Sequence, residues 1–151
     1  MARTEVSRKI EAPASVVFDT VAHIERFAKA VPHITEVEFL TEQRKGVGTR
    51  FAETRVMRGR QATTTLEVTE YVEDERIRLV SDEGGTIWDT VFTVTSGGQA
   101  ERAELKMVMD ARPYTFIAKI VNPLTKGIIR RAIEGDLDSV KAYCEANTTD
   151  D

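Results

Sequence analysis

The spacing of hydrophobic residues changes from period two to helical spacing and back along the first part of the chain. Val6 and Ile10 alternate with polar residues, which is typical of a half-buried strand, and Pro13 ends the run. From Pro13 to about Val31, apolar residues recur three and four positions apart, and proline is tolerated in a first helical turn. The sequence therefore predicts one strand followed by two short helices, broken near Ala22-His23.

Between Pro32 and Pro113 the pattern is mostly of period two, interrupted by turns. Apolar and β-branched residues predict six strands here, at about 37–39, 49–56, 62–72, 77–79, 88–94 and 105–109. The glycine pairs Gly84-Gly85 and Gly97-Gly98 lie between strands with no helix behind them, so they indicate hairpin turns and not phosphate-binding loops. Consecutive strands joined by short turns pair antiparallel, and the apolar face of such a sheet needs a partner.

Helical spacing returns after Pro113 and continues to about Glu145. Within this stretch, Asn122-Pro123 fits an N-cap followed by proline at the first helical position. We therefore expect a short helical turn and then a long helix from about Pro123 to Glu145, with Leu137 and Val140 in the core. This helix is the only predicted element large enough to cover the sheet.

Three short segments add a family resemblance to this order of elements. They are IEAPASVVF at 10–18, VGTRFAETR at 47–55 and GDLDSVK at 135–141. With the order of elements, they resemble the START-like (SRPBCC) superfamily, and within it the bacterial polyketide cyclase/dehydrase-like group, over about Glu5 to Glu145. None of the three segments is a catalytic signature, so no catalytic residue is transferred from the family.

The resemblance implies an α+β helix-grip fold. In it, a bent seven-stranded antiparallel sheet wraps around a long C-terminal helix, and two short helices lie between strands 1 and 2. It also implies a hydrophobic cavity between the sheet and the long helix, in a single START-like ligand-binding domain over residues 1–151. Members of the superfamily range from carriers of lipids or hormones to cyclases of aromatic rings.

Composition and charge narrow the range of partners. The chain has 21 basic and 25 acidic residues, a net charge of −4, so no overall positive field favours a nucleic acid or an anionic membrane. No apolar run approaches the roughly 20 residues needed to span a bilayer, and the N-terminus has no apolar signal segment. We expect a cytoplasmic protein that binds no nucleic acid and does not insert into a membrane. The sequence does not decide between a monomer and a homodimer.

Residue types that hold metals or act as nucleophiles are scarce. The two histidines, His23 and His33, and the single cysteine, Cys144, fall on separate predicted elements, at none of the ligand spacings typical of zinc. Cys144 lies in the apolar stripe of the last helix, where packing explains it, and no Gly-x-Ser-x-Gly motif occurs. We expect no metal, no cofactor and no disulfide.

The predicted strand at 49–56 carries two charged residues on the same face as a large apolar one. Residues two apart share a face of a strand, so Phe51, Glu53 and Arg55 lie on one side and Ala52 and Thr54 on the other. If Phe51 faces the cavity, a carboxylate and a guanidinium face it too. They are costly there unless paired, and they could orient a polar ligand group or act in acid/base chemistry. The alternatives are that the opposite face points inward, or that the two charges form a structural pair.

The resemblance and the strand register together define a candidate ligand site. Its residues are Phe51, Glu53, Arg55, Phe92, Leu105, Met107, Met109, Leu124 and Ile128. We expect an apolar molecule whose polar or anionic group is held by Arg55, or an uncharged ligand if Glu53 pairs permanently with Arg55.

Three functions stay open at this point. The first is binding of a small hydrophobic or aromatic molecule, lipid-like or polyketide-like. The second is a cofactor-independent cyclase, aromatase or dehydratase, with Glu53 and Arg55 as the candidate catalytic residues. The third is a regulatory or partner-binding domain that uses an outer surface.

Overall fold

The computed structural model describes residues 2–98 and 100–147. Its strands are β1 (Ala2–Ile10), β2 (Ile34–Phe39), β3 (Arg50–Met57), β4 (Arg60–Val72), β5 (Arg76–Glu83), β6 (Thr86–Ser96) and β7 (Ala103–Pro113). Two short helices, α1 (Ala14–Ala22) and α2 (Ile24–Ala30), lie between β1 and β2, and the long helix α3 (Phe116–Asn147) follows β7. The predicted α+β helix-grip order is confirmed.

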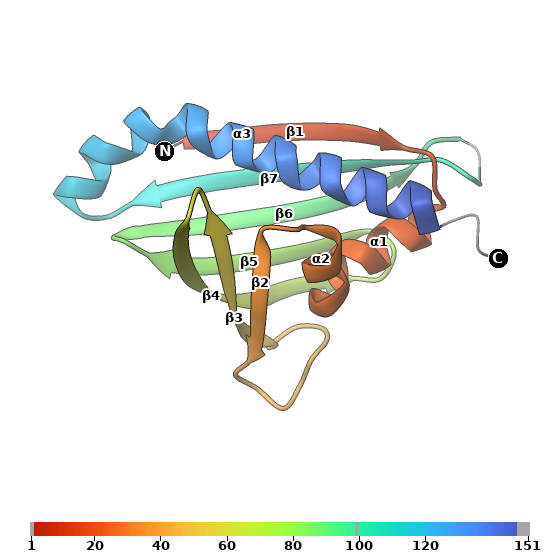
Figure 1. Ribbon diagram of the computed structural model, residues 1–151, viewed down its shortest axis with the longest axis horizontal. Helices are drawn as coiled ribbons and strands as arrows, with labels where there is room; N and C mark the ends of the chain where they lie inside the picture. Colours follow the sequence, from red (N-terminus) through yellow and green to blue (C-terminus); the bar gives the residue numbers. More distant parts are fainter. Residues whose placement is uncertain (1, 99, 148–151) are drawn as a thin grey trace.

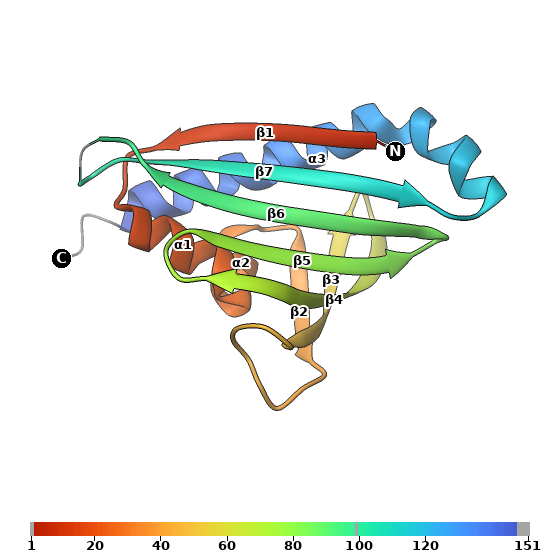
Figure 2. The same ribbon diagram turned by 180° about the vertical axis from the view of Figure 1, so that it is seen from behind.

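All seven strands belong to one antiparallel sheet, in the order β1-β7-β6-β5-β4-β3-β2. Register shifts interrupt β2 between Ile34 and Glu36 and β4 between Val68 and Glu70. Bulges of this kind bend a sheet and increase its twist. As a result, β2 and β3 run steeply across the direction of β5 to β7 (Figures 1 and 2).

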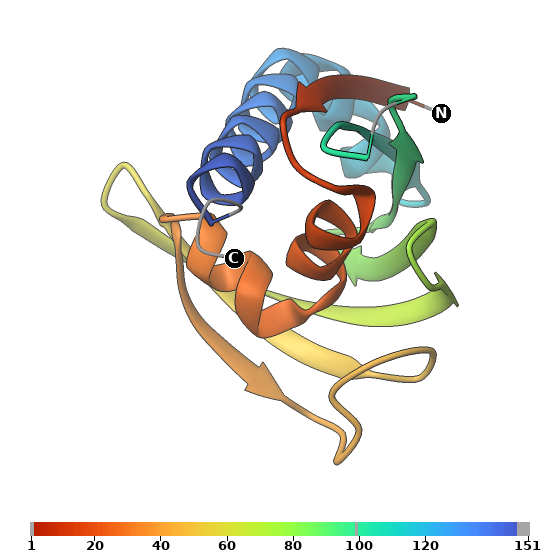
Figure 3. The ribbon, with the colours of Figure 1, turned by 90° about the vertical axis from the view of Figure 1, so that its right-hand side faces the viewer.

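Helix α3 closes the open side of the bent sheet and runs alongside β1 (Figures 1 and 3). Leu137, Val140 and Cys144 are fully buried, so the predicted docking of its C-terminal half is confirmed. The carboxylate of Glu145 fixes this end of the helix by accepting the backbone N–H of Glu11 at 2.9 Å. In the described part of the chain, no helix has the length and apolar character needed to cross a membrane.

The expected break in the last helix is wrong, because α3 continues through Pro123. Its N-cap is Thr115, whose Oγ1 accepts the backbone N–H of Ala118 at 3.2 Å. The side chain of Asn122 is not available as a cap, since it donates to Oγ1 of Thr86 at 2.9 Å. The hydrogen bond from Asn122 to the sheet therefore prevails over the Asn122-Pro123 pattern, which predicts a helix start.

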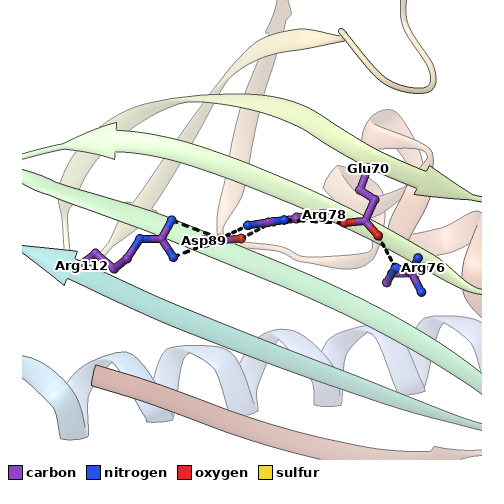
Figure 4. A network of polar contacts seen from close by, with 5 residues as sticks. All are labelled: Glu70, Arg76, Arg78, Asp89 and Arg112. Carbon is purple, nitrogen blue, oxygen red and sulfur yellow. Dashed lines mark hydrogen bonds and ion pairs between the residues drawn. The ribbon is translucent and has the colours of Figure 1, made fainter. Parts of the chain in front are cut away.

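The convex face of the sheet carries a chain of ion pairs across β4 to β7 (Figure 4). The buried carboxylate of Asp89 accepts hydrogen bonds from Arg78 at 2.8 Å and Arg112 at 3.2 Å. Arg78 also lies 3.7 Å from Glu70, which is bonded to Arg76 at 2.6 Å. The hydrogen bond from Arg78 holds the pKa of Asp89 below its ordinary value. These contacts tie together the four strands whose other face points inward.

Candidate functional site

A cavity of about 300 Å³ lies between the concave face of the sheet and the helices. This volume is at the small end of the roughly 300–1,000 Å³ typical of small-molecule sites. Strands β2 to β7 and all three helices contribute to the wall. The lining residues are Val21, Ile24, Phe27, Ile34, Val37, Phe51, Glu53, Arg55, Thr64, Leu66, Leu79, Ser81, Glu83, Trp88, Thr90, Phe92, Met107, Met109, Ile129, Ala132, Ile133 and Asp136.

Most of the wall is apolar, and part of it consists of flexible methionine side chains. Phe27 of α2 and Phe92 of β6 meet edge to face, with ring centroids 5.7 Å apart. Met107 and Met109 of β7 and Ile129 of α3 also line the cavity. Because methionine is flexible and polarizable, this wall suits an irregular apolar or aromatic molecule.

Two charged features interrupt the apolar wall. One is Glu83, whose Oε1 accepts the backbone N–H of Thr65 at 3.1 Å. We call the other the Glu53–Arg55–Asp136 cluster. The guanidinium of Arg55 donates through Nη1 and Nη2 to the two carboxylate oxygens of Asp136, each at 2.9 Å. Its Nε donates to Oε1 of Glu53, also at 2.9 Å. The side chains of Arg55, Glu53 and Asp136 are 24%, 12% and 8% exposed. The pairing of Glu53 with Arg55 is thus one part of a three-residue arrangement.

Two elements bring these charges together through their registers. On β3, the face with Phe51, Glu53 and Arg55 is the one that lines the cavity. On α3, Asp136 follows Ile133 by three residues, so both point toward the sheet. A carboxylate at such a buried helical position is costly without a partner, and Arg55 supplies one in bidentate geometry.

Burial and charge act on the cluster in opposite directions. Burial raises the pKa of Glu53 above its ordinary value, and the nearby Arg55 only partly offsets this. Burial also acts to lower the pKa of Arg55, but the hydrogen bonds and charges of Asp136 and Glu53 together outweigh it and raise the pKa. Arg55 therefore stays charged, and Glu53 keeps its proton to a higher pH than a solvated glutamate does.

Uncharged polar groups also face the cavity. Thr64, Ser81 and Thr90 line it, and within the described ranges their hydroxyls form no side-chain hydrogen bond. Oε2 of Glu53 likewise has no hydrogen-bond partner in the described part of the chain. A ligand with hydroxyl or carbonyl groups can therefore find partners without displacing an existing bond.

Six of the nine residues expected to form the ligand site lie on the wall of the cavity. They are Phe51, Glu53, Arg55, Phe92, Met107 and Met109. Their contact with a ligand stays a prediction. Leu105 does not line the cavity, because its side chain is fully buried within the core.

The expected placement of Leu124 and Ile128 on the cavity wall is wrong. Their side chains are 78% and 66% exposed on the outer side of α3. The sequence pattern suggests one apolar stripe, from Leu124 to Cys144, that drifts around the axis of the helix as it crosses the curved sheet. In the N-terminal half of α3, the residues that face the sheet are instead the small, buried Ala118 and Asn122, which donates a hydrogen bond to Thr86.

Asp136 is the cluster residue that the sequence did not single out. A signal was present, because Asp136 lies three residues after Ile133 and four before Val140, in line with the buried stripe of α3. A charged residue in such a stripe indicates a buried partner elsewhere. Only the fold shows that this partner is Arg55, 81 residues away along the chain.

Three carboxylates away from the cavity could hold a metal ion. Ligand atoms of Asp19, Glu73 and Asp74 lie within 4.8 Å of one another. Arg26 lies 3.8 Å from Asp19 and Lys45 lies 3.9 Å from Glu73, so cations of the chain already compensate part of this charge. Acidic groups at a surface commonly gather without an ion, so the absence of a metal stays a prediction.

The whole pattern agrees with one family model. The family described as polyketide cyclase/dehydrase and lipid transport matches residues 1–145. A search of curated proteins gave no match.

Solved structures share the fold at low sequence identity. A START superfamily protein from Mycobacterium smegmatis has a TM-score of 0.77 at 13% identity, covering 95% of this chain and 97% of its own. Zhui aromatase/cyclase from Streptomyces sp. R1128 has a TM-score of 0.78 at 18% identity, with 95% and 93% covered. Norcoclaurine synthase from Thalictrum flavum, in complex with dopamine and hydroxybenzaldehyde, has a TM-score of 0.69 at 14% identity, with 97% and 87% covered.

Proposed function

The chain belongs to the polyketide cyclase/dehydrase and lipid transport family of the START-like (SRPBCC) superfamily, and from this premise we propose that it forms a single ligand-binding domain. The ligand is a small, uncharged hydrophobic or aromatic molecule. The observation that carries the proposal is a mostly apolar cavity in which the one cation among the lining residues, Arg55, is already paired with carboxylates. Dopamine and hydroxybenzaldehyde, the compounds named with the norcoclaurine synthase structure, are likewise small aromatic molecules.

The charges of the Glu53–Arg55–Asp136 cluster favour an uncharged ligand. Arg55 and Asp136 cancel, and Glu53 adds zero or one negative charge, so the cluster has no net positive charge in either state. A ligand carboxylate would lose its hydration beside two carboxylates whose guanidinium partner is already engaged. Three of the five donors of Arg55 are used, which leaves N–H groups for a carbonyl or hydroxyl oxygen.

Native mass spectrometry of the freshly purified protein tests this proposal. We expect a species heavier than the 16.9 kDa chain by the mass of one small molecule, which denaturation releases. If purification removes the ligand, incubation with a panel of neutral aromatic and single-chain lipid compounds should restore such a species. The absence of any bound mass in both experiments would contradict the proposal.

A cavity-filling variant supplies the matched control. Ala132→Phe adds a ring to the cavity wall and should abolish the bound mass. Val47→Phe adds the same ring at a side chain that is 57% exposed outside the cavity, and should leave it unchanged. Equal occupancy in the two variants would place the ligand elsewhere.

Glu53 supports a second candidate function, a cofactor-independent cyclase, aromatase or dehydratase. Its raised pKa allows it to hold a proton inside the cavity, and its Oε2 has no partner among the described residues. A carboxylic acid placed in this way can protonate a ligand carbonyl, while the N–H groups of Arg55 stabilise negative charge on the oxygen.

Incubation with a poly-β-ketone thioester, followed by analysis for cyclised or dehydrated products, tests the second candidate. We expect Glu53→Gln to lower product formation by about 100-fold or more and to keep neutral ligands bound. Product formation at the spontaneous rate in wild type, or equal rates in wild type and variant, would exclude this activity and leave the binding function.

A further inference from the structure

The N-terminal half of α3 exposes a continuous row of large apolar side chains. We call it the α3 ridge, and it consists of Phe116, Ile117, Ile120, Val121, Leu124 and Ile128, which are 44% to 78% exposed. At 3.6 residues per turn these six side chains occupy a sector of roughly 140° over about 18 Å of helix. Among the residues that the structure describes, no other element lies over this outer side of α3 (Figures 1 and 3).

The ridge belongs to a helix that is held firmly in place. On the opposite side, Ala118 is 3% exposed and Asn122 donates to Thr86 at 2.9 Å. Thr115 caps the first turn. The apolar side chains are thus presented on a fixed surface, and contiguous exposed apolar surface of this extent marks an interaction site.

The same segment carries only positive charge. Residues 111–133 contain no Asp or Glu, whereas the whole chain has a net charge of −4. Lys119, Lys126, Arg130 and Arg131 are all exposed on this part of α3. None of the four forms an ion pair with any residue that the structure describes, and Arg130 donates only to the backbone carbonyl of Glu5 at 3.4 Å.

We propose that the α3 ridge docks on the surface of an anionic lipid bilayer. A helix with aliphatic and aromatic side chains on one side and unpaired lysine and arginine beside them can lie in the membrane interface. Its apolar side chains enter the boundary of the acyl chains, and its cations remain among the anionic headgroups. The expectation against an anionic membrane came from the net charge of the whole chain, which hides this local excess of cations.

A second copy of the chain fits this surface less well. In a symmetric dimer the same patch would meet itself, so the interface would gather cations of both copies and no carboxylate from residues 111–133. Like charges brought together across an interface are unfavourable. The ridge residues do not line the cavity, so membrane docking stands independently of the proposed ligand.

Flotation of the full chain with lipid vesicles tests the proposal. We expect binding to vesicles of phosphatidylcholine with phosphatidylglycerol, little binding to phosphatidylcholine alone, and weaker binding as salt is added. The double variant Leu124→Ser/Ile128→Ser should lower the partition coefficient by about tenfold or more. Val47→Ser, which removes an exposed apolar side chain outside the ridge, should leave it unchanged.

Charge variants separate electrostatic from apolar contributions. Lys119→Gln and Lys126→Gln should each lower the partition coefficient about fivefold. Lys29→Gln on α2, an exposed lysine without an ion pair in the described ranges, should have no effect. Because the altered side chains are exposed, all variants should melt as wild type does, which excludes loss of the fold as the cause.

Several outcomes would overturn membrane docking. One is the absence of wild-type binding to the anionic vesicles, and another is equal binding by the ridge variant and Val47→Ser. Light scattering that shows a dimer in wild type and a monomer in Leu124→Ser/Ile128→Ser would assign the ridge to a second copy instead.

Discussion

Among single residues, Arg55 and Asp136 have the largest effect on the character of the cavity. Their bidentate pair joins β3 to α3 at the cavity wall. In a partly buried pair, loss of one partner leaves an uncompensated charge, and this costs more than the intact pair contributes. The two residues therefore act as a unit that is both a structural tie and a polar feature of the site.

Substitution of Arg55 tests this unit. Arg55→Met keeps much of the aliphatic volume and removes the guanidinium, so Asp136 loses its partner. We expect the free energy of unfolding to fall by about 2–4 kcal/mol, at or below the value for a fully buried pair, since Arg55 is still 24% exposed. Urea denaturation measures the change. The double variant Arg55→Met/Asp136→Asn should recover more than half of the loss, and additive losses would show that the residues do not interact.

The proton of Glu53 makes stability depend on pH. Burial raises the pKa of Glu53 above its ordinary 4.5, so the folded state binds this proton more tightly than the unfolded state does. The resulting stabilisation is fully present below pH 4.5 and is lost as the pH rises through the raised pKa.

Glu53→Gln removes this titration. Wild type should therefore lose stability relative to the variant as the pH is raised from 4.5 through the raised pKa of Glu53. Urea denaturation at a series of pH values measures the difference. Glu38 is exposed, so the stability of Glu38→Gln should change with pH in the same way as that of wild type. A constant difference between wild type and Glu53→Gln would show that the Glu53 proton is held no more tightly after folding.

The residues of the site were predictable from the sequence where alternation along a strand indicates which face of the sheet a side chain lies on. The alternation along β3 was sufficient to group Phe51, Glu53 and Arg55 on one face. It could not indicate Asp136, because a contact between distant segments depends on how α3 lies across the sheet. It also could not separate Leu105, which is packed in the core, from Met107, which lines the cavity.

Among the elements, the strands follow the sequence pattern closely and α3 does not. Short turns and period-two alternation leave few arrangements for β4 to β7, and the antiparallel order was predicted. The start of α3 depends instead on Thr115 as the cap and on the bond from Asn122 to Thr86. These contacts form only when the helix docks, so a local N-cap motif could not give the helix start.

Truncation of Leu137 tests how α3 is docked. Its side chain is fully buried, so Leu137→Ala should lower the free energy of unfolding by about 2–5 kcal/mol, the range for a well-packed leucine. Leu124→Ala is the matched control in the same helix, because its side chain is 78% exposed, and it should cost little. Chemical denaturation of both variants gives the comparison. Similar losses in the two variants would contradict the docking.

For the molecule as a whole, the fold divides its apolar surface between an enclosed site and an exposed one. The C-terminal half of α3 covers the cavity and the core, while its N-terminal half carries the α3 ridge on the outside. Net charge and composition describe neither surface, because they average over the chain. The central claim is that the enclosed surface binds a small apolar molecule without charge.

Fluorescence of Trp88 tests that claim most directly. Trp88 is the only tryptophan of the chain and lines the cavity, so its emission reports on occupancy. The protein is titrated near neutral pH with an aromatic carboxylic acid and with the methyl ester of the same acid. We predict a saturable change with the ester and a Kd about tenfold or more below that of the acid. An acid that binds as tightly as its ester, or more tightly, would contradict the claim.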